Sequence, residues 1–170
     1  MRRTLDALYL AAGRLAGVFM VGTLAFVLIG ITGRLANFHL RGTDAYAGYC
    51  MAAAGFLALA HTLRRGEHIR VSLVLQRLSP PSRRGLDVAC HVVGLLLSGL
   101  FAWFCVRLAW QSYSFNDVSQ ATDATPLWIP QLAMALGTLV LFIAFVDSLI
   151  DAARGRTPSP EAAAEPAHVE

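Results

Sequence analysis

Two histidines are the residues whose type and placement best suit chemistry in this chain. His61 lies near the end of one apolar run and His91 near the start of the next, so both should sit at a similar depth. A pair of histidines on facing helices can ligate a b-type haem. Both also lie near enough to the ends of their runs to hydrogen-bond with interfacial water. The pair is compatible with haem ligation, or with interfacial histidines that hold no cofactor.

Other common chemistries have no visible site in the sequence. It contains no P-loop, no GxSxG and no HExxH pattern. The three cysteines, Cys50, Cys90 and Cys105, form no CxxC pair and lie inside apolar runs, where a thiol behaves as a small apolar group. We therefore expect a protein that is not an enzyme and that binds no metal or cofactor.

The composition indicates a membrane protein. Hydrophobic residues make up 56% of the 170 residues, charged residues only 15%, and the mean hydropathy is +0.54. The net charge of +3 and the pI near 9.1 do not indicate nucleic-acid binding, because the arginines flank the apolar runs. We therefore expect the chain to contact membrane lipid and not nucleic acid.

Four charge-free windows set the architecture. They cover about residues 15–33, 45–63, 88–106 and 126–146, and each is long enough to cross a hydrocarbon core of about 30 Å as a helix. The fold class we predict is all-α, an integral membrane four-helix bundle. Asp, Glu and Arg residues lie only near the ends of the windows, which is unlike the path of an autonomous transporter.

The polar segments divide the chain further. Residues 1–14 form a predicted cytoplasmic head, and 15–156 form the membrane domain. The tail 157–170 is rich in proline, alanine and glutamate, so we expect it to be disordered.

Between the second and third windows we predict an interfacial amphipathic helix over about residues 67–78. Its apolar positions follow the i, i+3, i+4, i+7 spacing of a single stripe, and arginines surround them. The predicted lipid-surface contacts are Arg64, Arg65, His68, Arg70, Val71, Val74, Leu75, Arg77 and Leu78.

The arginines also predict the orientation. With four spans, one side of the membrane holds the two termini and the segment between the second and third spans, and that side carries most of the arginines. Arginine-rich loops stay in the cytoplasm. Both termini should therefore be cytoplasmic, and the acidic connection 111–123 should face outward.

Small residues suggest where another helix could approach. Gly13 and Gly17 form a GxxxG pair, and Gly48, Ala52 and Gly55 recur along the second span. Such positions permit close backbone contact, although glycine is also tolerated in a helix that faces lipid. At the adjacent ends of the first two spans, where the chain turns from one to the other, Arg34 and Asp44 form either an ion pair or two solvated charges.

Two longer patterns resemble a known family. Residues 65–71 read Arg-Gly-Glu-His-Ile-Arg-Val before the surface helix, and residues 125–131 read Thr-Pro-Leu-Trp-Ile-Pro-Gln at the start of the last span. With the acid and aromatics that open the second span, their order closely resembles the small membrane subunit, often called DctQ, of tripartite ATP-independent periplasmic (TRAP) transporters. The last motif adds Pro126, Trp128 and Pro130 to the candidate packing positions.

The resemblance implies a function. A subunit of this kind supports a large membrane subunit, which takes up an organic acid, such as a dicarboxylate, with a sodium gradient and without ATP. A periplasmic binding protein delivers the substrate, and the location is the bacterial inner membrane. The alternative is a small b-type cytochrome or the membrane anchor of a redox enzyme, with His61 and His91 as haem ligands.

Overall fold

The computed structural model describes residues 2–38, 40–64, 80–121 and 123–154. This part of the chain folds into four helices: α1 (Arg2–Leu35), α2 (Thr43–Arg64), α4 (Pro80–Ser114) and α5 (Trp128–Ala153). All four are long and apolar enough to cross a membrane. The predicted all-α, four-helix membrane architecture is confirmed, and the chain is a multi-pass membrane protein.

Two helices extend well beyond the charge-free windows. α1 has 34 residues and α4 has 35, which at 1.5 Å per residue is about 50 Å each, more than the hydrocarbon core requires. Residues 2–14, expected as a separate polar head, are the first turns of α1. The start of α4 at Pro80 also precedes the expected boundary at 88, and proline is well tolerated in a first turn.

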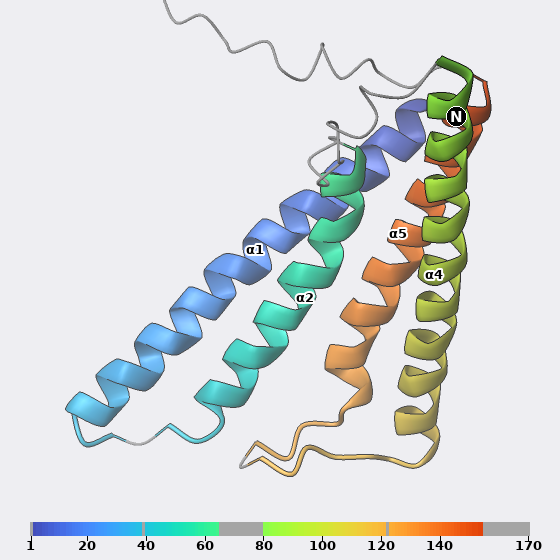
Figure 1. The fold of residues 1–170 in the computed structure, drawn as a ribbon. Helices are drawn as coiled ribbons and strands as arrows, with labels where there is room; N and C mark the ends of the chain where they lie inside the picture. The colour runs from blue at the N-terminus through green and yellow to red at the C-terminus, as the bar shows by residue number, and fades with distance from the viewer. Residues whose placement is uncertain (1, 39, 65–79, 122, 155–170) are drawn as a thin grey trace, which may run out of the picture.

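The four helices lie side by side in the order α1, α2, α5, α4 (Figure 1). Helix contacts join α1 to α2, α2 to α5 and α5 to α4, while α1 meets α5 at few positions. The structure thus makes α2 and α5 the inner helices of a layer, and α1 and α4 its two edges. Large apolar side chains remain exposed along both edges, for example Val21 at 67% and Leu96 at 68%, as lipid contact requires.

Small residues allow the inner helices to pack closely. A Cβ added at Gly137 of α5 would lie 2.6 Å from the backbone carbonyl atoms of Phe56 on α2. Between α5 and α4, an added Cβ atom at Gly94 would collide with the ring of Phe145, and one at Gly99 would lie 3.0 Å from the ring of Phe142. Close approach of this kind supplies the dispersion contacts that hold helices together in lipid.

The two ends of the layer are named here by the residues that they hold. At the Arg64 end lie the starts of α1 and α4 and the ends of α2 and α5. At the Asp123 end lie the connections 36–42 and 115–127, which meet because a Cβ on Gly42 would be 2.8 Å from the Cβ of Asp123. Gly42 has a φ of +85°, a conformation that favours glycine. The predicted surface helix at 67–78 and the predicted tail at 157–170 lie outside the described residues.

Candidate partner interface and the polar clusters at the helix ends

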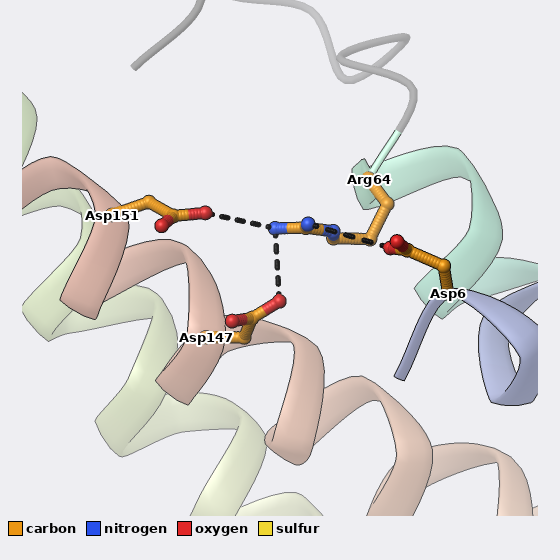
Figure 2. A network of polar contacts seen from close by, with 4 residues as sticks. All are labelled: Asp6, Arg64, Asp147 and Asp151. Carbon is orange, nitrogen blue, oxygen red and sulfur yellow. Dashed lines mark hydrogen bonds and ion pairs between the residues drawn. The ribbon is translucent and has the colours of Figure 1, made fainter. Parts of the chain in front are cut away.

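Arg64, the last residue of α2, lies among three acidic side chains from two other helices (Figure 2). Its guanidinium group is 3.1 Å from Asp147 and 3.5 Å from Asp151, both on α5, and 3.8 Å from Asp6 on α1. The side chains of Asp147 and Asp151 are only 15% and 13% exposed, while that of Asp6 is 63% exposed. One guanidinium group therefore connects α1, α2 and α5 at this end.

Tyr9 forms the apolar base of this Arg64 cluster. The guanidinium carbon of Arg64 is 5.5 Å from the centroid of its ring, within the range of a cation–π contact. The ring is 2% exposed and packs with Ala60 of α2 and Ala144 of α5. Because small residues on both helices leave room for an aromatic ring, Tyr9 fills the junction of three helices.

At the opposite end, Asp123 connects the α4–α5 loop to α2. Its carboxylate accepts a hydrogen bond of 3.2 Å from the hydroxyl of Tyr49. Hydrogen bonds from the side chain of Thr125, and then from those of Ser119 and Tyr49, hold the pKa of Asp123 below its ordinary value, although partial desolvation acts in the opposite direction. Ionised Asp123 is therefore a stabilising acceptor that links the loop to the second span.

Arg34 and Asp44 also meet, at 2.8 Å, across the turn between α1 and α2. Their side chains are 62% and 81% exposed, so water screens the charges strongly. An ion pair of this kind contributes between 0 and about 1 kcal/mol. It helps to orient the turn, and its exposure makes it a useful reference for the more buried Arg64 cluster.

The GxxxG pair of α1 is divided between two environments. A Cβ on Gly13 would lie 2.9 Å from the Cγ of His61, so this glycine is already used to seat the imidazole of α2. No side chain or neighbouring backbone of a described residue lies within 4 Å of the corresponding position on Gly17, which faces outward. In the part of the chain that the structure describes, Gly17 is therefore the member of the pair that leaves open space.

The small residues of the second span form an open face. Gly48, Ala52 and Gly55 are all exposed, and Cβ atoms added to the two glycines would meet no described residue within 4 Å. Met51 on the same face is 66% exposed. The buried face of α2 instead consists of Ala47, Ala53, Ala54, Leu57 and Ala60. We define Gly48, Met51, Ala52 and Gly55 as the α2 small-residue face.

The two histidines do not face each other. His61 lies against Gly13 of α1, whereas His91 is on α4, at the other edge of the layer, with α5 between α2 and α4. The Nδ1 atom of His91 is 2.7 Å from the backbone carbonyl oxygen of Asp87 in its own helix. The arrangement therefore does not support a haem held between these two residues.

The remaining candidate positions lie at the two ends of the helix layer. Pro126 pairs with Val118 in an isolated antiparallel bridge, and Trp128 packs edge-on against Tyr113 with ring centroids 5.8 Å apart. Pro130, in the first turn of α5, is half-buried. Of the predicted lipid-surface contacts, Arg64 lies in the cluster described above. The others, at residues 65, 68, 70, 71, 74, 75, 77 and 78, lie outside the described residues.

Sequence reasoning did not identify the Arg64 cluster. Asp147 and Asp151 were recognisable only as polar residues that mark the end of the last span, and Asp6 as part of the head. The sequence did contain one signal for an ion pair. Asp147 and Asp151 are four residues apart and so lie on one face of a helix, and Arg64 ends another apolar run that crosses the membrane in the same direction. That signal does not say which helices are neighbours, so it cannot select the pairing.

Comparison with known families assigns the chain. A sequence model described as tripartite ATP-independent periplasmic transporters, DctQ component, matches residues 23–155. Comparisons with curated proteins and with solved structures found no match. The matched range includes all of α2, α4 and α5 and residues 23–35 of α1, and the four apolar helices described above fit a membrane component of a transporter. The chain therefore belongs to the DctQ family of TRAP transporter subunits.

Proposed function

We propose that this chain is the small permease subunit that supports a large membrane subunit in sodium-driven, ATP-independent uptake of an organic acid. A periplasmic binding protein would deliver the substrate to the complex. Membership of the DctQ family is the observation that carries this proposal. The helix layer adds support, since four long apolar helices with wide exposed edges form a broad membrane anchor against which another subunit can move.

The proposed orientation places the Arg64 end in the cytoplasm of a cell with an inner membrane. The arginine count assumes that the N-terminal ends of α1 and α4 lie on the same side as the C-terminal ends of α2 and α5, and the described helices have this arrangement. Arginines concentrate near that end in the sequence. The Asp123 end would then face the periplasm, where a binding protein can reach it.

For the contact with the large subunit we propose the α2 small-residue face. Helices in lipid gain no hydrophobic free energy by association, so backbone approach and dispersion contacts must supply the attraction. Gly48, Ala52 and Gly55 keep the surface of α2 low, and no residue of the described chain fills the space above the two glycines. A partner helix could approach here more closely than at the leucine-covered edges.

An Ala52→Leu change tests this interface. Ala52 is exposed, so added bulk should leave the isolated subunit folded while it separates a partner helix. The matched control is Ala89→Leu, an identical change at an exposed position of α4. Each variant is produced with the large subunit, and pull-down recovery, thermal stability in mild detergent and sodium-dependent uptake are measured.

We expect Ala52→Leu to reduce recovery and uptake by about tenfold, which corresponds to about 1.4 kcal/mol, with unchanged stability of the isolated subunit. Ala89→Leu should behave as the unmodified chain. If both variants retain the partner and the uptake, the α2 small-residue face is not the interface. If the unmodified chain recovers no large subunit and supports no uptake, the proposed function itself fails.

A further inference from the structure

Among the described residues of the Arg64 cluster, three carboxylates from α1 and α5 surround one guanidinium group from α2. Arg64 makes its closest pair with Asp147, at 3.1 Å. Asp6 is 3.8 Å from the same guanidinium group, near the limit of an ion pair, and its side chain is 63% exposed. One guanidinium charge is thus shared by two carboxylates, even before Asp151 is considered. The pairing leaves Asp6 weakly balanced and open to solvent.

A buried hydroxyl in the same place also lacks a partner. The Tyr9 side chain is 2% exposed, and its oxygen makes no hydrogen bond to any described residue. The guanidinium carbon of Arg64 is 5.5 Å from the centroid of the Tyr9 ring, so the phenol lies directly beside the charges of the cluster. A buried hydroxyl without a hydrogen bond carries an uncompensated desolvation cost. An additional group that bonds to this oxygen would remove that cost.

We propose that Asp6, Tyr9 and Asp147 bind one ammonium or guanidinium group of a partner protein, a lysine or arginine side chain. This inference rests on the proposed function, because the partner is the large membrane subunit. A basic side chain would donate to the exposed Asp6 carboxylate and, once it displaces the groups that cover the buried Tyr9 oxygen, to that oxygen as well. It would also supply positive charge in addition to that of Arg64. Charge-assisted hydrogen bonds of this type are stronger than neutral ones.

A basic side chain fits these residues better than the simpler occupants. A water molecule can pair with the Tyr9 hydroxyl, but it cannot balance the charge of Asp6. A bound metal ion is not favoured, since the described residues contain no group of three or more His, Cys, Asp or Glu that could hold one. Long lysine and arginine side chains can reach a site at a helix end from a neighbouring chain.

The site lies at the end of the layer, so it does not compete with the α2 small-residue face. α1 has 34 residues, about 51 Å, so its first turns extend beyond a hydrocarbon core of about 30 Å. Asp6 lies in the second turn and is accessible from water. A loop or helix end of the partner can therefore approach it outside the apolar part of the membrane.

The test compares Asp6→Arg and Tyr9→Phe with Asp117→Arg. Asp117 is an exposed acid at the opposite end, so its variant reproduces the change in charge without touching the cluster. Each chain is produced with the large subunit, extracted in mild detergent, and scored for recovery of that subunit in low and in high NaCl. The melting temperature of each isolated small subunit is measured in parallel.

We expect Asp6→Arg to reduce recovery by at least tenfold in low salt, with an unchanged melting temperature, and Tyr9→Phe to reduce it about threefold. High salt should reduce recovery of the unmodified complex and have less effect on Asp6→Arg. Equal recovery for Asp6→Arg and Asp117→Arg would overturn the inference, provided that the unmodified chain binds the large subunit. If it does not bind, the proposed function fails first.

Two further results would also overturn it by identifying another occupant. One is stabilisation of the isolated unmodified subunit, but not of Asp6→Arg, by NaCl relative to choline chloride at equal ionic strength. The other is the same selective stabilisation by phosphatidylethanolamine relative to phosphatidylcholine in nanodiscs. The first would indicate a small inorganic cation and the second a lipid headgroup.

Discussion

Replacing Arg64 by glutamine should destabilise this subunit far more than the same change at Arg34. The change removes the only described guanidinium group within 4 Å of Asp147, whose side chain is 15% exposed. Asp151, at 13% exposure, loses one of its partners. At the other end, Arg34→Gln releases Asp44, which is 81% exposed and remains hydrated.

The magnitude follows from the difference in exposure. Removing one partner of a fully buried ion pair costs about 3–5 kcal/mol, whereas an exposed pair contributes about 0–1 kcal/mol. Arg64 is 24% exposed and its acids about half that, so the pair is between these limits but nearer the buried one. We expect Arg64→Gln to cost about 2 kcal/mol and Arg34→Gln to cost under 1 kcal/mol.

Reversible unfolding of the purified subunit in mixed micelles of mild detergent and dodecyl sulfate, followed by circular dichroism, measures both values. A second substitution refines the test: Asp147→Asn in the Arg64→Gln background replaces a buried charge by an amide that can pair with glutamine. It should restore at least half of the loss. Equal losses for Arg64→Gln and Arg34→Gln would refute the argument from burial, as would an Asp147→Asn change that adds to the loss.

Three further predictions concern packing, pH and topology. Gly137→Ala should destabilise the subunit by about 1–3 kcal/mol, because the new methyl group meets the Phe56 backbone, while Gly55→Ala has open space and should be neutral in the same unfolding assay. Hydrogen bonds lower the pKa of Asp123, so its contribution to stability is present above the unfolded value of 3.8 and lost as the pH falls through the lower folded value. Asp123→Asn should therefore reduce the fall in melting temperature between pH 5 and pH 2. With the native cysteines removed, a cysteine at Ser119 should react with an impermeant maleimide from the periplasmic side, and labelling only from the cytoplasm would reverse the proposed orientation.

Local sequence determined the existence and type of the helices. Runs of about 20 residues without charge must form helices in lipid, because each backbone polar group needs an internal hydrogen bond. The windows at 45–63 and 126–146 consequently lie within α2 and almost entirely within α5. α1 and α4 extend beyond their charge-free windows, since neither apolarity nor charge prevents a helix from continuing into water when its residues favour helix or pack on a neighbour.

Only the tertiary structure decided which helices are neighbours and which small residues remain open. Gly13 and Gly17 have the same local pattern, yet one is filled by His61 and the other is free. In the same way, Arg64 ends its apolar run much as Arg34 does, but α5 brings two acids to Arg64 and water surrounds Arg34. Helical periodicity places a residue on a face, whereas burial and charge balance depend on the element packed against that face, and that information is distributed over segments far apart in the chain.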